Sequence, residues 1–329
     1  MDWTTKKVLI TGADGFIGSH LTQGLISRGA QVKAFVMYNS FNTWGWIDTF
    51  TPADKEAVDV VCGDIRESDI LKHALKDVDI VFHLAALIAI PYSYKSPSSY
   101  IKTNIEGTLN LLQTGLDCGV EKIIHTSTSE VYGTAHYTPI DEKHPLQGQS
   151  PYSASKIGAD MLAESFYRTF NLPVTTVRPF NTYGPRQSAR AIIPTLILQM
   201  LKGTTIRIGS LHPVRDFTYV SDTVEGFIKA AETNGITGRV LNLGSNRGIS
   251  IGELASTLAK IMEKEVTIEC EEDRVRPPHS EVNQLICDNQ RAQQLIGWQP
   301  MVYLEEGLSK TIDWFEKTSQ AYKSDLYNI

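Results

Sequence analysis

Short apolar runs alternate with longer amphipathic stretches over the first half of the chain. Six of these runs, mostly continuous rather than alternating, predict strands at 8–11, 31–36, 58–62, 80–84, 122–126 and 174–178. Continuous apolar runs are typical of parallel strands that helices cover on both faces. The pattern therefore predicts an α/β fold with a Rossmann-like, doubly wound parallel sheet.

The rhythm becomes less regular beyond residue 180. Clusters of Pro, Gly and Arg replace the apolar runs at 184–186, 212–215 and 274–278. We expect a dinucleotide-binding Rossmann domain over residues 1–180 with a return segment at 217–243. The segments 181–216 and 244–329 are then expected to form a smaller C-terminal substrate-binding lobe.

Composition and charge exclude some classes of partner and site but do not identify the function. The 329 residues are 42% hydrophobic and 21% charged, which is ordinary for a globular protein. A net charge of -6 argues against a nucleic-acid or anionic-membrane partner. The four cysteines lie far apart without a CxxC pair, so we expect neither a disulfide framework nor a metal site. The first apolar run is too short for a signal peptide or a membrane span, and a cytoplasmic location is expected.

A glycine-rich loop follows the first predicted strand and opens a helix. Its glycines would permit a tight turn at Gly12, close approach of a pyrophosphate at Gly15 and close packing of the helix at Gly18. A glycine-rich turn without a ligand is the alternative. The residues expected to contact a dinucleotide here are Gly12, Asp14, Gly15, Phe16, Ile17 and Gly18.

The end of the second predicted strand bears on which dinucleotide is bound. It reads Val36-Met37-Tyr38-Asn39, without the acidic residue that often binds an adenosine 2′-hydroxyl and without an Arg for a 2′-phosphate. Because a cation for the additional dianion is missing, we expect NAD rather than NADP. Tyr38 could serve the ribose or merely begin the following loop.

A tyrosine and a lysine share one face of a predicted helix. Ser150-Pro151 is a helix-start signal, and Tyr152 and Lys156 follow at a spacing of four residues. The ammonium group, with a positively charged nicotinamide, is expected to lower the pKa of Tyr152 toward that of a useful general base. An exposed amphipathic helix is the alternative explanation.

A carboxylate lies among hydroxyl groups after the fifth predicted strand. Thr128, Ser129 and Glu130 occupy its carboxyl end, where ligands bind in open α/β sheets. Their position predicts a reaction centre, although a solvated loop carboxylate would also fit this spacing.

These motifs together resemble the extended short-chain dehydrogenase/reductases that act on nucleotide-sugars. The resemblance rests on the GxxGxxG loop, on 63–65, on 84–86 and on 178–186. It implies further cofactor contacts from Asp64, Ile65, Leu84, Ala85, Ala86, Thr126 and Pro179. It also implies substrate contacts from Thr128, Asn181, Arg190, Arg215 and Arg276, although each Arg could equally be a surface salt-bridge partner.

The residue at Glu130 separates the activities within this group. Simple 4-epimerases resemble the chain elsewhere but have a small apolar residue there, whereas 4,6-dehydratases have Glu, preceded by Thr-Ser in the GDP-mannose enzymes. The resemblance implies that Tyr152 accepts the 4-hydroxyl proton and Glu130 the C5 proton, while Thr128 holds the 4-oxygen and Lys156 the nicotinamide ribose. Either Glu130 or a water held by Ser129 protonates the leaving 6-hydroxyl.

Three segments look like one bacterial subgroup that dehydrates nucleotide-linked N-acetylglucosamine for surface glycans such as legionaminic acid. They are 38–46, 89–94 and 322–329. The motifs leave open UDP or GDP, with UDP favoured, and also leave open the configuration at C5. The resemblance further implies a homodimer that pairs the helix of Tyr152.

Three other functions remain open. A UDP-glucuronate decarboxylase also has a Thr-Ser-Glu run. That family uses an Arg as the cation for the sugar carboxylate, and the corresponding segment 285–288 has no Arg. A 4-epimerase is disfavoured by Glu130. A non-catalytic dinucleotide-binding regulator would have little reason to keep Tyr152, Lys156 and Glu130 together.

Overall fold

The computed structural model describes residues 1–323, and a seven-stranded parallel sheet forms its centre. The strands lie in the order β10-β6-β5-β4-β1-β2-β3, and every pairing is parallel. They are β1 (Lys7–Thr11), β2 (Gln31–Met37), β3 (Val58–Gly63), β4 (Ile80–His83), β5 (Lys122–Thr126), β6 (Val174–Pro179) and β10 (Val240–Leu243). The predicted Rossmann-like sheet is confirmed. Residues 324–329, which complete the C-terminal segment used for the subgroup resemblance, lie outside the described residues.

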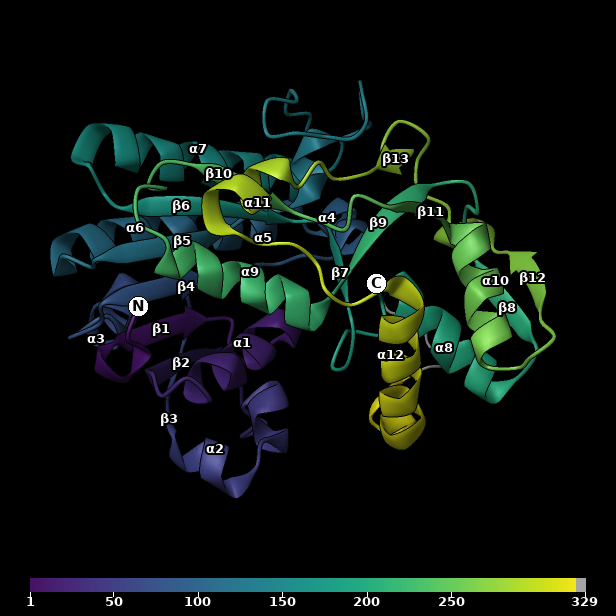
Figure 1. Cartoon of the computed structure of the whole chain (residues 1–329), viewed down its shortest axis with the longest axis horizontal. Helices are drawn as coiled ribbons and strands as arrows, with labels where there is room; N and C mark the ends of the chain where they lie inside the picture. The colour runs from purple at the N-terminus through teal and green to yellow at the C-terminus, as the bar shows by residue number, and fades with distance from the viewer. Residues whose placement is uncertain (324–329) are drawn as a thin grey trace.

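Helices cover both faces of this sheet (Figure 1). One face carries α1 (Phe16–Ile26), α9 (Val220–Glu232) and α11 (Gln290–Ile296), whose apolar side chains share a core with β1 and β2. The other face carries α3 (Ser68–Ala74), α6 (Gly107–Cys118) and α7 (Pro151–Phe170). Burial on both faces explains why the strands read as continuous apolar runs.

A smaller lobe lies at the carboxyl ends of the strands (Figure 1). Its core joins α8 (Ile192–Lys202), α10 (Ile251–Ile261), α12 (Leu304–Thr318), β8 (Thr205–Ile208) and β12 (Thr267–Cys270). A further small sheet contains β7 (Asn181–Tyr183), β9 (Val214–Tyr219), β11 (Gly248–Ser250) and β13 (Gln284–Leu285). We propose that the boundary between the Rossmann domain and the smaller lobe lies near residue 180. Because α11 packs on α9, it adds a second return segment to the one expected at 217–243.

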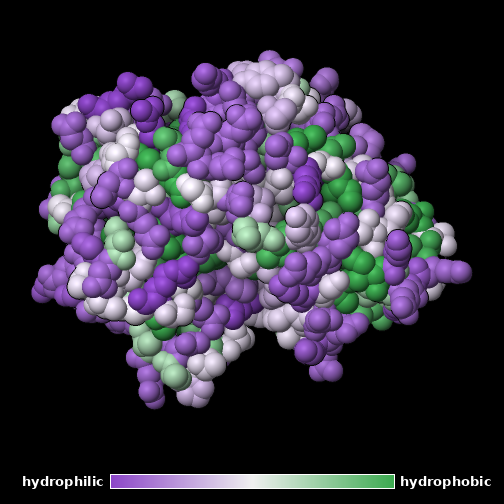
Figure 2. All heavy atoms as spheres, in the orientation of Figure 1, coloured by the Kyte–Doolittle hydropathy of each residue, from purple (hydrophilic) through white to green (hydrophobic). Residues whose placement is uncertain are grey.

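Short helices connect these layers. They are η1 (Trp3–Thr5), η2 (Gly45–Thr49), α2 (Pro52–Glu56), α4 (Ile90–Lys95), α5 (Pro97–Tyr100), the π-helix η3 (Ile101–Glu106), η4 (Ser129–Tyr132), η5 (Glu272–Arg274) and η6 (Ser319–Ala321). Figure 2 shows an indentation at the lower edge of the molecule, between the part that carries α2 and the part that carries α12. Among residues 1–323, no helix is long and apolar enough to cross a membrane.

Candidate active site

The glycine loop between β1 and α1 is packed too tightly for side chains at two positions. Gly12 has a φ of 70°, and a Cβ atom there would lie 2.9 Å from the Ala85 nitrogen. A Cβ atom on Gly18 would lie 2.1 Å from the Gly12 carbonyl oxygen. Gly15 caps the helix without a side chain, so the first N–H groups of α1 face the loop. Phe16 is the first residue of α1, so the prediction that the loop opens a helix is confirmed. The loop has the form of an anion cradle.

The segment after β4 closes one side of this loop. The N–H groups of Leu84 and Ala85 each donate to the Thr11 hydroxyl at 3.1 Å. Ala86 follows them directly in the chain. The segment is therefore held against the glycine loop, as a cofactor-lining role requires.

Four other predicted cofactor residues lie just after β2 and β3 and in the glycine loop itself. Tyr38 is 69% exposed. Asp64 accepts hydrogen bonds from the Arg66 guanidinium at 2.9 and 3.0 Å, whereas Ile65 is buried in the core. The Asp14 carbonyl accepts from the Trp46 N–H at 3.1 Å, which ties the loop of 39–46 to the glycine loop. Burial raises the pKa of the Asp14 carboxyl.

The helix that carries the tyrosine and lysine begins as predicted. Pro151 is its first residue, and Ser150 and Ser153 form a reciprocal cap. Lys156 is 4% exposed, and its ammonium group donates to the Thr126 carbonyl at 2.6 Å. Burial lowers the pKa of Lys156 to about 8, although the nearby Asp160 carboxylate acts in the opposite direction. The buried Thr126 hydroxyl has no hydrogen-bond partner among the described residues.

The pKa of Tyr152 differs from the sequence expectation. Burial raises it above its ordinary value, a hydrogen bond with Thr128 lowers it in part, and the Glu130 charge raises it again. The groups of the protein chain alone therefore raise this pKa, and the lowering expected with a bound nicotinamide stays a prediction. The reason is that Tyr152 is 7% exposed and packs edge-on against the Tyr100 ring, with centroids 6.2 Å apart.

The carboxylate segment forms the turn η4 directly after β5. The Thr128 hydroxyl accepts from the Glu130 N–H at 3.2 Å and so caps this turn. Ser129 is buried, whereas Glu130 is half-buried. Glu130 interacts electrostatically with both Tyr152 and Arg215. The fold thus brings Thr128, Glu130 and Tyr152 into one cluster.

Two of the predicted arginines lie beside this cluster. Arg215 is 6% exposed, with its guanidinium 3.3 Å from Glu281, and Arg276 approaches the same carboxylate at 3.7 Å. Burial lowers the pKa of Arg215, the Glu130 charge raises it and the Arg276 charge lowers it. Two cations at one carboxylate leave positive charge available for an anionic ligand.

The remaining predicted substrate residues are less closely joined to the cluster. The buried Asn181 side-chain oxygen has no partner among the described residues. Arg190 is exposed and bonds the Ser188 hydroxyl at 3.2 Å, and its charge lowers the pKa of Tyr100, which burial raises to about 12. Pro179, which was expected to contact the cofactor, is buried at the end of β6.

Sequence reasoning missed three polar residues behind the site. Asp160 follows Lys156 by one helical turn and bonds Arg178 of β6. Its spacing of four residues from Lys156 could have indicated that it shares a helix face with Tyr152 and Lys156. Asn104, in the π-helix η3, accepts from the Leu87 N–H at 2.8 Å and donates to the Ser155 hydroxyl at 2.9 Å. The spacing of the motifs gave no signal for Asn104.

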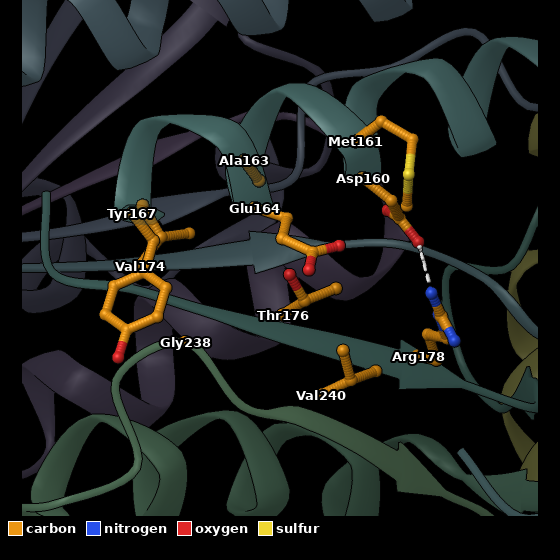
Figure 3. Close-up of a pocket in the computed structure, with 10 residues that line it drawn as sticks. All are labelled: Asp160, Met161, Ala163, Glu164, Tyr167, Val174, Thr176, Arg178, Gly238 and Val240. Atoms are coloured by element: carbon orange, nitrogen blue, oxygen red, sulfur yellow. Dashed lines mark hydrogen bonds and ion pairs between the residues drawn. The ribbon is translucent and has the colours of Figure 1, made fainter. Parts of the chain in front are cut away.

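A surface pocket between α7, β6 and β10 is separate from this cluster. Met161 and Tyr167 line it from α7, and Val174 and Val240 line it from the two strands (Figure 3). Asp160 and Arg178 lie at one end of it, joined by an ion pair. None of the residues predicted for the cofactor or substrate is among the ten that line this pocket.

Comparison with known proteins agrees with this geometry. A family model described as GDP-mannose 4,6 dehydratase matches residues 9–311. The dTDP-D-glucose 4,6-dehydratase of Mus musculus is 31% identical over 331 residues, which cover 97% of this chain and 91% of the mouse protein.

Solved structures with both kinds of activity have the same fold. The dTDP-glucose 4,6-dehydratase of Streptomyces venezuelae, with NAD bound, superposes with a TM-score of 0.83 at 28% identity, over 96% of this chain and 99% of its own. A UDP-glucuronic acid 4-epimerase mutant from Bacillus cereus, with NAD and a fluorinated UDP-sugar, has a TM-score of 0.87 at 31% identity, over 95% and 99%. Overall fold alone therefore does not separate dehydration from epimerisation.

Proposed function

The chain belongs to the nucleotide-sugar 4,6-dehydratase and epimerase family of extended short-chain dehydrogenase/reductases, and we propose that it is a 4,6-dehydratase of nucleotide-linked N-acetylglucosamine. The observation that carries this proposal is the placement of Glu130. Its carboxylate lies within electrostatic reach of Tyr152, at the carboxyl end of a central strand. A base in addition to the tyrosine is what elimination needs and simple epimerisation does not.

The residues present fit NAD, the cofactor found in the solved relatives. Close backbone packing at Gly12 and Gly18 fixes the loop, and Gly15 caps α1 without a side chain, so the amino end of the helix is suited to a pyrophosphate. The unpaired Thr126 hydroxyl and the Lys156 ammonium group lie at the end of β5, where they are suited to the nicotinamide ribose. NAD held there would supply a reversible acceptor for the hydride of the sugar.

The protein's own groups then move the protons. Tyr152 accepts the proton of the sugar 4-hydroxyl, and Thr128 holds the resulting carbonyl oxygen by a hydrogen bond. The C5 hydrogen, now alpha to a ketone, becomes acidic, and Glu130 accepts it as a proton. The 6-hydroxyl is beta to the ketone, takes a proton from Glu130 or from a water held by Ser129, and leaves as water. C6 then receives a hydride and C5 a proton, which replaces the one removed. The product is a 4-keto-6-deoxy sugar, without net oxidation or reduction.

The charge around Arg215 supports a nucleotide diphosphate in the substrate. Arg215 and Arg276 share the single Glu281 carboxylate, and planar guanidinium groups suit pyrophosphate oxygens. We assign Asn181 and Arg190 to the same ligand. UDP is favoured over GDP, and the aminosugar follows from the resemblance of the segments 38–46 and 89–94.

We propose a homodimer that pairs α6 and α7, as the family resemblance implies. Leu109 of α6 is 39% exposed, and Met161 and Phe170 of α7 are 45% and 49% exposed. Exposed large apolar side chains on neighbouring helices favour association. Size-exclusion chromatography with light scattering measures the mass in solution, which is twice that of one chain for a homodimer.

A 4-epimerase is the second candidate, because epimerases are among the solved relatives. Incubation with NAD and UDP-N-acetylglucosamine, GDP-N-acetylglucosamine or UDP-glucuronate, followed by mass spectrometry, distinguishes the candidates. Loss of water supports the dehydratase. Loss of carbon dioxide identifies a decarboxylase, and an isomer of unchanged mass identifies an epimerase.

A further inference from the structure

One buried carboxylate connects the two sides of the turn that carries Glu130. Asp160 of α7 is 3% exposed and accepts hydrogen bonds on both oxygens. One oxygen accepts from His125 of β5 at 3.1 Å, and the other accepts from the Ser127 hydroxyl at 2.8 Å. The strand end that leads into Thr128 is therefore fixed by Asp160.

The same carboxylate reaches the far side of the turn through an arginine. Arg178 of β6 is 4% exposed and donates to Asp160 at 2.8 and 3.2 Å (Figure 3). Its remaining terminal nitrogen donates to the Tyr132 hydroxyl at 3.0 Å, and that hydroxyl donates to Asn242 of β10 at 2.7 Å. Tyr132, the last residue of η4, is fully buried.

The residues between these two anchor points are held mainly by short-range bonds. The Glu130 N–H donates to the Thr128 hydroxyl at 3.2 Å, and the Val131 N–H donates to the Thr128 carbonyl at 3.4 Å. From outside the turn, the Gln147 N–H donates to the Val131 carbonyl at 2.8 Å. Thr128 also bonds Tyr152, so the location of the turn relative to Tyr152 depends on that bond together with the anchored ends.

We propose that Asp160, Arg178 and Tyr132 form a clamp on residues 128–131 and act as positioning residues for Glu130. The inference rests on the proposed function, in which Glu130 accepts the C5 proton. Proton abstraction is sensitive to the position of the base, and a misplacement of about 1 Å lowers rates by about 100-fold. Buried ionic and hydroxyl bonds are directional, so they define the position of the turn more narrowly than apolar packing does.

The charge state of the clamp is constant over the working range of an enzyme. Burial acts to raise the pKa of Asp160, but the bond from His125 and the charge of Arg178 outweigh it and lower the value to about 2. The pair therefore remains ionised at neutral pH. Arg178 also lies over the Tyr132 ring, 5.0 Å from its centroid.

Replacement of one hydroxyl tests the clamp with little change in packing. Tyr132→Phe keeps the ring beneath Arg178 and removes the two bonds of the hydroxyl, one from the Arg178 guanidinium and one to Asn242. Arg178→Lys keeps a cation for Asp160 but loses the fork that also reaches Tyr132. Tyr183→Phe is the matched control, because Tyr183 is equally buried in the smaller lobe and its hydroxyl makes one bond to the Leu304 carbonyl at 3.1 Å.

The first readout needs no substrate. Amide hydrogen exchange in the peptide 127–133 is expected to accelerate at least about 10-fold in Tyr132→Phe and in Arg178→Lys, while Tyr183→Phe leaves this peptide unchanged. Unchanged exchange in both clamp variants overturns the inference. Because this readout does not involve turnover, it stands even if the wild-type protein dehydrates none of the three nucleotide-sugars.

The second readout is specific to the proposed step. With substrate deuterated at C5, kcat of Tyr132→Phe is expected to fall about 10- to 100-fold with an increased isotope effect, and KM is expected to change little. The double variant with Arg178→Lys should lose less than the sum of the two single losses, because both changes break the shared link between Arg178 and Tyr132. A lower melting temperature with a wild-type isotope effect would reduce the clamp to a purely structural ion pair.

Discussion

The buried ammonium group of Lys156 makes stability depend on pH in a direction opposite to that of a salt-bridged lysine, whose pKa is raised. Its pKa is lowered from 10.5 to about 8 because burial disfavours the charged form. Since one decade in proton affinity equals about 1.36 kcal/mol, the charged lysine costs about 3 kcal/mol in the folded protein at neutral pH. Between these two pKa values the unfolded chain binds more protons than the folded chain, so this contribution to stability increases as the pH rises.

Replacement of Lys156 by Met isolates this contribution, because Met fills a similar volume without a charge. The free energy of unfolding of the wild type, minus that of the variant, is expected to increase by about 2 kcal/mol between pH 7 and pH 9.5. Urea unfolding followed by circular dichroism at a series of pH values measures the difference, in which all other titrating groups cancel. Two parallel curves would refute the reasoning, because they would show that burial does not perturb Lys156.

The remaining predictions concern the cofactor loop and the acid step. Gly18→Ala is expected to weaken NAD binding at least about 10-fold and to destabilise the fold by about 1–3 kcal/mol, because its Cβ atom would meet the Gly12 carbonyl oxygen at 2.1 Å. Gly203→Ala, which would meet no atom within 4 Å, is the control in both calorimetric titration and thermal unfolding. Ser129→Ala is expected to lower kcat less than about 10-fold, because Ser129 is 3% exposed and has little surface to hold a water. A loss in kcat above about 100-fold would assign protonation of the 6-hydroxyl to such a water instead of Glu130.

The central sheet was predictable because its signal is local. Continuous apolar runs located β5 at its observed residues, and Ser150-Pro151 located the first residue of α7. Turn and helix chemistry also depends on near neighbours, so the glycine loop and the shared face of Tyr152 and Lys156 followed from spacing.

The environment of the site could not be predicted because it is built from distant contacts. Tyr132 and its partner Asn242 are 110 positions apart in sequence. The raised pKa of Tyr152 depends on burial against Tyr100, the last residue of the short helix α5 between β4 and β5. Spacing predicts which side chains share a face, but it does not show how far they are removed from water.

The proposed dehydration depends most directly on Glu130 as the base that accepts the C5 proton. Formation of the 4-keto-6-deoxy product by Glu130→Gln is therefore the decisive measurement, made with NAD and the nucleotide-sugar that the wild type dehydrates. The account predicts a rate at least about 100-fold below wild type, together with retained oxidation at C4, which would be visible as reduced cofactor. Product formation at the wild-type rate would contradict it.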